Sequence, residues 1–456
     1  MKRTFTIVAA LVLLVVAGAW GYWAYRQHRS YQTPIPSTAT SLVRIGVDGL
    51  LVDIAWNALW NRSYYQGQPT EKTSKFDRSV WSQTGVAIPA NIFVYQLGAS
   101  EQEQISDLYF GSLALTDSAA FSQWLTTQSH LNIQQDTLGT VITSEHLAAV
   151  YDADRVFFAL SPKKITSALS PIRGAIQALM ASDSRQTTVD ESPFQAIRKL
   201  SGDVVALGAQ QTTIEFENGA ILFSIADTSN HSSRESHSTA QAGIPQFQAS
   251  NTVSLWTAGL PSFLSGKTYE LGPYTLAGDS LLKYDQGNII LEWKDTVMQH
   301  DTVISYDYDD DFTIQERIEL VEKPAPEVYL SIETANGLAD YLRAQGIFGT
   351  QGLNREVLPL YQVRVDHIDP HFLQLHTAST PSIIPEPGPA TDDFLYLRVN
   401  VERIDSTVIS PVFTPYLQLF DQLEATGTRA AGENPTIHGT LHLHNPHIHS
   451  LVQLLN

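Results

Sequence analysis

Five histidines near the C-terminus are the residues whose type and spacing could most directly do chemistry. The chain contains 14 histidines, and the five in question are His438, His442, His444, His447 and His449. On a strand, the first three would share one face, because side chains alternate along a strand. The H-x-H pair at 442 and 444 lets two imidazoles reach one metal ion, and the two later histidines could add a ligand. The pattern predicts a zinc or copper site.

A second interpretation stays open: a solvent-facing strand whose polar positions are histidines, with no metal. The heptapeptides GSLALTD at 111–117 and GTLHLHN at 439–445 share the pattern G-[ST]-L-x-L-x-[DN], and a helical apolar pattern follows each. Ala114 and Thr116 stand where the second copy has His442 and His444, so this unit does not need histidine in order to fold. We interpret the two copies as an internal duplication, with one copy in each half of the chain.

Local catalytic motifs are incomplete. The chain has no cysteine, which excludes disulfides, thiol catalysis and cysteine-ligated zinc. The run from Gly278 to Leu281 spells the nucleophile block of a hydrolase family, but no histidine has an aspartate three residues before it. We identify no catalytic and no cofactor-binding residue, and we expect a protein without enzymatic activity. An enzyme built from scattered carboxylates is the alternative.

The elements that must position these residues follow an α+β pattern. Apolar runs predict strands at 42–47, 108–115 and 328–333, and a helical pattern follows each. Asp48 and Asp117 are the expected N-caps of the first two helices. Hairpins are expected at Asn218-Gly219 and around 309–311. We therefore expect two related layers of mostly antiparallel sheet with packed helices, after an N-terminal transmembrane helix.

The helix that follows Asp48 carries aromatic residues at a spacing of four. Trp56, Trp60 and Tyr64 would line one side of it. A sugar-stacking face is one interpretation. A buried core stripe is favoured, because large aromatic side chains at helical spacing usually supply the apolar face of a packed helix.

The N-terminus predicts a membrane anchor. Basic residues flank an uncharged stretch from Thr4 to Tyr25. At a rise of about 1.5 Å per residue, this helix would cross a hydrocarbon core of about 30 Å. A signal peptide cleaved after Ala19 is the alternative, but cleavage would leave the aromatic residues at 20–25 as an exposed new terminus. An uncleaved signal anchor is therefore favoured.

Composition along the 456 residues divides the chain into two halves. We expect a signal anchor at 1–30, a linker at 31–41 and a first α+β domain at 42–228. The stretch 229–251 is rich in Ser, His and Gln, and it predicts a polar linker or loop. A second α+β domain would then cover 252–456.

The charge of the chain bears on its partners. Lys and Arg number 28 against 47 Asp and Glu, a net charge of −19. Binding to nucleic-acid phosphates needs basic residues, so a nucleic-acid partner is not expected. A short N-terminal span followed by a large domain usually exports that domain.

The N-terminal span, the sequence PIPSTATSLVRI at 34–45 and the sequence GSLALTDSAAFSQWL at 111–125 resemble bacterial membrane-anchored envelope proteins of unknown function. The resemblance implies an envelope protein of unknown function. From the anchor, the duplicated layers and the lack of a complete catalytic set, we expect a single-pass protein of the inner membrane with its large C-terminal part exported to the periplasm. We expect it to bind or scaffold a protein partner in the envelope. The membrane itself would be contacted through residues 4–25.

Overall fold

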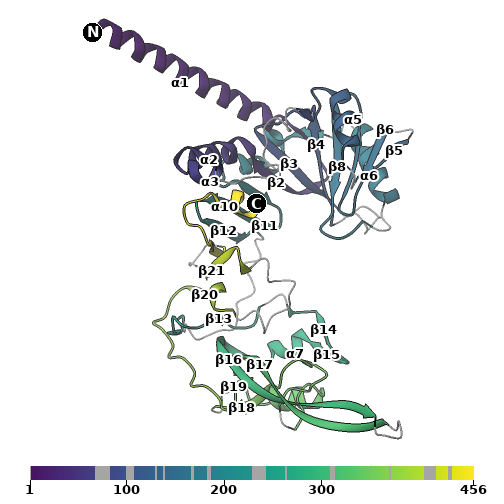
Figure 1. Cartoon of the computed structure of the whole chain (residues 1–456), viewed down its shortest axis with the longest axis vertical. Helices are drawn as coiled ribbons and strands as arrows, with labels where there is room; N and C mark the ends of the chain where they lie inside the picture. Colours follow the sequence, from purple (N-terminus) through teal and green to yellow (C-terminus); the bar gives the residue numbers. More distant parts are fainter. Residues whose placement is uncertain are drawn as a thin grey trace. The chain divides into compact units, whose positions relative to one another are not determined.

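The structure is a computed structural model of the whole chain. It describes residues 2–66, 83–98, 107–128, 131–136, 139–165, 169–181, 186–228, 243–261, 264–308, 314–350, 352–368, 371–404, 417–429 and 434–455. Within these ranges, the side chains at 2–12, 15–16, 66, 136, 169, 303–308 and 314–315 are not described. The fold is mixed α+β, with mostly antiparallel sheet and few helices (Figure 1).

The chain divides into two compact units. The first comprises residues 1–228 together with 447–456, and the second comprises 229–446. The first segment of the first unit ends at Thr228, just before the polar stretch that starts at 229. The last ten residues were expected to belong to the second domain of 252–456, but they belong to the first unit. They belong to the first unit because Asn57 of that unit binds the backbone oxygen of His447, and Asn218 pairs with His449.

The first unit contains one long antiparallel sheet. Its strand order is β12-β11-β10-β2-β3-β4-β8-β7-β6-β5. The strands are β2 (Ala39–Gly46), β3 (Asn91–Leu97), β4 (Tyr109–Ala114), β5 (Asn132–Asp136), β6 (Gly139–Thr143), β7 (Leu147–Tyr151), β8 (Arg155–Leu160), β10 (Val204–Leu207), β11 (Gln210–Glu217) and β12 (Ala220–Asp227). The hairpin expected at Asn218-Gly219 is confirmed as the turn between β11 and β12, where Gly219 has a φ of 67°.

Short elements and helices complete the first unit. They are α1 (Lys2–Tyr31), α2 (Val47–Trp60), α3 (Arg62–Gln66), α5 (Ser118–Thr126), α6 (Leu169–Ala181), η3 (Val189–Glu191), η4 (Gln195–Arg198) and α10 (Ser450–Leu455), with the two-stranded pair β1 (Pro34–Pro36) and β9 (Gln186–Thr188). The expected linker at 31–41 is wrong, because Tyr31 and Ile35 are buried in the main core of the unit. Residues 34–36 pair with β9 for the same reason: burial of Ile35 brings its backbone against that strand.

The second unit contains an antiparallel sheet of eight strands within the described residues. Its order is β18-β19-β17-β16-β13-β20-β21-β22. The elements are β13 (Val253–Ala258), β16 (Asp285–Tyr308), β17 (Ile314–Thr334), α8 (Leu338–Ala344), β18 (Arg364–His367), β19 (Phe372–His376), β20 (Asp393–Asn400), η6 (Val401–Arg403), β21 (Phe420–Thr428) and β22 (Thr436–Leu443), with the hairpin β14 (Thr268–Leu271) and β15 (Tyr274–Ala277) and the short α7 (Gly278–Leu282).

The two units repeat one strand order. In the first, the neighbouring strands run β7-β8-β4-β3-β2-β10-β11-β12, and in the second β18-β19-β17-β16-β13-β20-β21-β22 take the same positions. The helices after β4 and β17 also correspond, since α5 begins at Ser118 and α8 at Leu338, each separated from its strand by three residues. The two matching heptapeptides do not lie at equivalent positions of this strand order. GSLALTD begins on β4, which corresponds to β17, whereas GTLHLHN begins on β22, which corresponds to β12.

The segments after the two heptapeptides also differ. Asp117 caps α5 directly, since its carboxylate accepts hydrogen bonds from the backbone N–H groups of Ala119 and Ala120. After Asn445, in contrast, the next helix begins only at Ser450. The expected N-cap at Asp117 is confirmed. The helix expected after the second heptapeptide is found as α10, but it does not follow Asn445 directly as α5 follows Asp117.

α1 joins the first unit through its last turns. Arg26 forms a two-pronged ion pair with Asp48 at 2.8 and 3.0 Å, and Asn91 donates hydrogen bonds to Gln27 and Ser30 at 2.7 Å. Among the described residues, no helix is long and apolar enough to cross a membrane, so the expected transmembrane helix has no support from the structure. The side chains at 4–12, 15 and 16, on which that expectation depends, lie outside the described part.

α2 differs from the expectation in its N-cap and in the side that it buries. Asp48 is not its N-cap, because the helix begins at Val47 and Asp48 pairs with Arg26 instead. The aromatic stripe is not a core stripe: Trp56 is 62% exposed and Trp60 is 71% exposed. The side that faces the protein carries Leu50 and the polar Asn57.

β16 and β17 form a long two-stranded ribbon (Figure 1). Among the described strands, only the ends of the ribbon nearest the sheet have other strand neighbours, since β13 pairs with residues 288–293 and β19 with residues 329–333. The expected turn at 309–311 lies outside the described residues. The core of this unit lies at the sheet end, where Leu276, Leu342 and Leu373 belong to one buried cluster.

Candidate metal centre

The candidate site lies on three neighbouring strands of the second unit. β20 leads into η6, which carries Glu402, and β21 begins with Phe420 and Asp421. β21 pairs Phe420 with Leu443 and Gln422 with His442, so Asp421 is an extra residue with no partner on β22. Such a bulge bends the strand and re-aims the side chain of the extra residue. The bulge therefore places the Asp421 carboxylate beside the end of β22.

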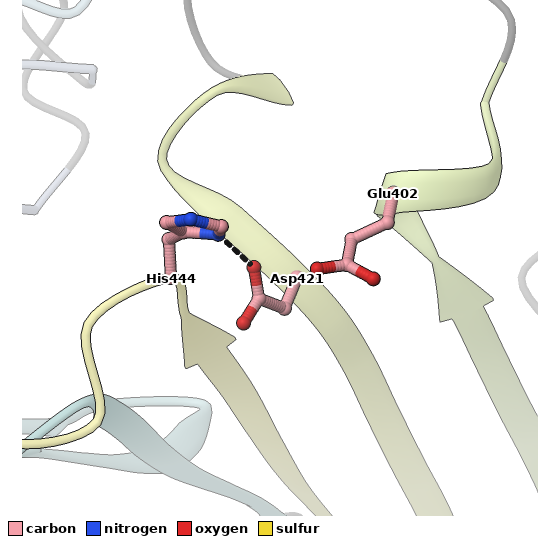
Figure 2. A group of neighbouring side chains, drawn as sticks. All are labelled: Glu402, Asp421 and His444. Atoms are coloured by element: carbon pink, nitrogen blue, oxygen red, sulfur yellow. Dashed lines mark hydrogen bonds and ion pairs between the residues drawn. The ribbon is translucent and has the colours of Figure 1, made fainter.

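His444 lies just beyond the end of β22. Its backbone N–H donates to the backbone oxygen of Leu419 at 3.1 Å, which fixes the chain past the strand. Its ring Nδ1 lies 2.9 Å from Oδ1 of Asp421. Figure 2 marks this contact with a dashed line. The hydrogen bond to Asp421 and its charge raise the pKa of His444, and the charge of Glu402 adds to the rise.

Glu402, Asp421 and His444 form a group that could hold a metal ion. Their nearest ligand atoms, two carboxylate oxygens and one imidazole nitrogen, all lie within 4.8 Å of one another. Figure 2 shows the three side chains converging from η6, β21 and the end of β22. Glu402 and His444 are exposed, and Asp421 is half-buried. Three protein ligands with an open side would leave room for water or another small ligand on a bound ion.

The structure separates the five histidines that the sequence singled out. His438 and His442 lie on β22 with exposed side chains, opposite Thr426 and Gln422. Leu443, which lies between His442 and His444 in the chain, is buried. The expected alternation of exposed histidine and buried leucine is therefore confirmed at this end of the strand. Within the described residues neither His438 nor His442 joins a group of three ligands, whereas His444 does.

The last two histidines belong to the first unit. His447 is exposed, and its backbone oxygen accepts hydrogen bonds from the amides of Asn57 and Asn61. His449 is 1% exposed, and both of its ring nitrogens lack a hydrogen-bond partner in the structure. Burial lowers the pKa of His449. Among the described residues, neither histidine joins a group of three possible ligands.

Two residues of the group were not found from the sequence. Glu402 and Asp421 lie far from the histidine run in the chain, and no local motif marks either of them. The signal that matters is the bulge at Asp421, which depends on the register between β21 and β22. A register of this kind cannot be read from one strand alone.

A serine and a lysine also meet in the second unit. Nζ of Lys294 donates to Oγ of Ser382 at 2.6 Å. A nucleophilic serine would need that amine neutral, so that it could accept the hydroxyl proton. The ammonium is instead stabilised by Glu292 at 3.9 Å and by the ring of Tyr329, whose centroid lies 4.8 Å away. This arrangement favours a structural role for the contact.

Comparisons with known proteins add little. No family model and no curated protein matches the chain. Solved structures of a protein named TP0453 are similar to it at TM-scores of 0.21 for crystal form III and 0.22 for crystal form I, with 8% and 11% identity. The alignments cover 76% and 75% of this chain and 92% and 89% of the other. Likeness at this level assigns no function to the chain.

Proposed function

We propose that the chain is a membrane-anchored envelope protein that binds or scaffolds a partner and has no catalytic activity. Residues 4–25 would be its single span in the inner membrane, and the large C-terminal part would lie in the periplasm. The observation that carries the proposal is the uncharged, apolar stretch from Thr4 to Tyr25, which forms one continuous helix with the residues on either side. Its length matches that of a bilayer core.

Two features of the described residues support this proposal. The ring side chains of Trp20, Tyr22 and Trp23 near the end of the stretch are exposed to between 47% and 69%. Rings of this kind favour the headgroup level of a bilayer. The helix is also held at its base, because Arg26 is paired with Asp48 of the folded unit. An anchor with a fixed base would hold the unit at a defined distance from the membrane.

The test is flotation and labelling of the full chain in bacterial membranes. The chain has no cysteine, so a single Gln123→Cys variant reports its side of the membrane. We expect the protein to float with membranes after alkaline washing, and a membrane-impermeant maleimide to label position 123 from the periplasmic side. Recovery in the soluble fraction would overturn the anchor, and labelling only after lysis would overturn the orientation. Repeated cross-linking of one partner would identify the binding role.

A second candidate function is the binding of a divalent metal ion, zinc or copper, by the second unit. The specific observation that favours it is the convergence of Glu402, Asp421 and His444. A nitrogen and two carboxylate oxygens suit zinc, and a copper ion would also accept the imidazole. Asp421 and His444 already satisfy each other as an ion pair, so metal would have to replace that contact.

Metal analysis of the purified full chain tests this candidate. After equilibration with zinc or copper and gel filtration, we expect about one ion per chain. Asp421→Ala should abolish the bound ion, whereas His438→Ala, an exposed histidine of β22 outside the group, should leave it unchanged. Equal metal content in both variants would exclude the group as the site.

A further inference from the structure

α2 presents an unbroken apolar half to the outside of the first unit. Five of its large side chains are well exposed: Leu51 at 46%, Val52 at 59%, Trp56 at 62%, Leu59 at 47% and Trp60 at 71%. With Ala55, which is also exposed, they cover one side of the helix at about 100° per residue. Asp53 is the one charged residue among the exposed positions of α2. We call these six residues the α2 face.

The orientation of α2 is fixed by hydrogen bonds on its other side. The side-chain nitrogen of buried Asn57 donates to Asn218 at 2.7 Å and to the backbone oxygen of His447 at 2.8 Å. Its side-chain oxygen accepts from Tyr65 at 2.8 Å. Rolling the helix to bury the apolar half would leave this amide and its partners without hydrogen bonds, which costs about 1–3 kcal/mol for each buried group. The exposure of the α2 face is therefore part of the fold.

A surface of this kind is unusual on a soluble protein. Apolar patches of several hundred Å² mark a contact with a partner or a membrane. The rings of Trp56 and Trp60 lie edge to face with centroids 6.0 Å apart, which makes one continuous aromatic surface. At 14 residues the helix is too short to span a bilayer, but it is long enough to lie in its interface.

The connection between α2 and α1 identifies the occupant. Arg26 is the first charged residue after the apolar stretch of α1, and it holds Asp48 in the first turn of α2. If Thr4–Tyr25 spans the bilayer, Arg26 lies at the headgroup level, and α2 begins at that same level. Arg26 also donates to the backbone oxygen of Ile88, another exposed apolar residue. The start of α2, the helix that carries the α2 face, is thus fixed at the end of the apolar stretch of α1.

We propose that the α2 face lies in the headgroup–acyl boundary of the membrane, beside the anchor. The proposal rests on the proposed function, because it needs Thr4–Tyr25 to be the anchor. Leucine and valine side chains enter the acyl boundary, and the two tryptophans occupy the headgroup level. α2 has two aspartates and no basic residue, so its binding depends on apolar contact and not on anionic lipid.

Fluorescence quenching in vesicles tests this placement with the full chain. A single cysteine at Ala55→Cys, within the α2 face, is labelled with an environment-sensitive fluorophore. Ser122→Cys, an exposed position of α5, is the matched control. Each protein is reconstituted into phosphatidylcholine vesicles that contain a lipid with a nitroxide near its headgroup. We expect the probe at 55 to lose most of its emission and the probe at 122 to lose little, with or without phosphatidylglycerol.

The outcomes separate this inference from the anchor proposal. If the protein floats with the vesicles and position 55 stays unquenched, the α2 face does not contact lipid and this inference fails alone. If the protein does not float, the anchor proposal fails and this one fails with it. A lipid-independent blue shift at 55 with cross-linking between chains would identify a second copy as the occupant and overturn the inference. The double substitution Trp56→Ser/Trp60→Ser is then added to each labelled variant. We expect the quenching at position 55 to fall and the emission at position 122 to stay unchanged.

Discussion

Two connections occupy the same position in the repeated strand order, and they treat their apolar residues in opposite ways. β2 and β3 of the first unit are joined through α2 and α3, and β13 and β16 of the second are joined through β14, β15 and α7. In the second unit, Leu276 is buried, and Tyr274 and Leu281 pack against the same core as α8. In the first, Trp56 and Trp60 face outward.

The difference shows which apolar residues the fold requires. The sheet is completed in both units, but α2 buries only Leu50 among its large apolar side chains, whereas the connection of the second unit packs several such side chains into a core. The composition of the α2 face therefore has no folding reason within the first unit, and it points to something outside that unit. The two units share their strand order and differ in what this connection contributes.

The candidate metal group differs between the units in the same way. β20 and β21 are joined by residues 401–419, which carry Glu402, whereas β10 and β11 are joined by only Gly208 and Ala209. The first unit therefore has no room for an equivalent of Glu402 at this place. The units therefore differ in their connections, while the order of the strands is the same.

The largest effect that tests the comparison is a truncation in each connection. Leu276→Ala should destabilise the second unit by about 2–5 kcal/mol, because it leaves a cavity in a packed core. Trp56→Ala should change stability by less than about 0.5 kcal/mol, because the ring is exposed. Urea unfolding of the full chain, followed by hydrogen exchange on peptides of each unit, measures both. A Trp56→Ala cost as large as that of Leu276→Ala would mean that the α2 face is covered by protein.

The second effect concerns the polar side of α2. Asn57→Ala should destabilise the first unit by about 1–3 kcal/mol, because Asn218 and the backbone oxygen of His447 lose a buried donor. Asn61→Ala is the matched control, since its amide also donates to His447 but is exposed. Hydrogen exchange of α2 and α10 reports the loss. Equal protection in the two variants would show that Asn57 does not fix the orientation of α2.

The elements themselves were largely predictable from the sequence. The strand at 42–47, the strand at 108–115 and the helix capped by Asp117 depend on local alternation and on a side chain that caps its own helix, and all three are found. The hairpin at Asn218-Gly219 is equally local. The α+β class follows from such elements, because their type is decided within a few residues.

The failures share a different cause. The face of α2 that is buried is decided by Asn218 and His447, which are far away in the chain, so the aromatic spacing alone gave the wrong side. The linker at 31–41 failed because the core that buries Ile35 is built from residues far away in the chain, such as Phe93 and Val189. The candidate metal group was missed in the same way, because the position of Asp421 depends on the register between β21 and β22. Local sequence patterns predict helices and strands, but contacts between residues far apart in the chain decide which face of each element is buried.

A third effect tests how firmly α2 is held at its start. Asp48→Asn should cost about 1 kcal/mol, because it removes the charge from a two-pronged pair with Arg26 that is partly shielded from solvent. Asp340→Asn in α8 removes an exposed pair with Arg343 and should cost less than about 0.5 kcal/mol. High salt should reduce the cost of Asp340→Asn strongly and the cost of Asp48→Asn far less. Thermal unfolding at two salt concentrations measures it.

The smallest effect is a difference in pH dependence between the units. Burial lowers the pKa of His449 below its ordinary value of 6.5, so the unfolded chain binds the proton at a higher pH than the folded chain does. As the pH falls through 6.5 toward the folded pKa, the unfolded state gains protons first and the first unit loses stability. In His444 the pKa is raised, so its contribution to the second unit is present below 6.5 and is lost as the pH rises through the folded pKa.

Hydrogen exchange at pH 7.5 and 5.5 should therefore show α10 and α2 opening more readily at the lower pH, while β21 and β22 become slightly better protected. His449→Phe fills the same buried space without a titrating group, and it should remove the pH dependence of the first unit only. If α10 keeps the same pH dependence in that variant, His449 is not its source. The sign of each slope, rather than its size, distinguishes the buried histidine of one unit from the exposed ion pair of the other.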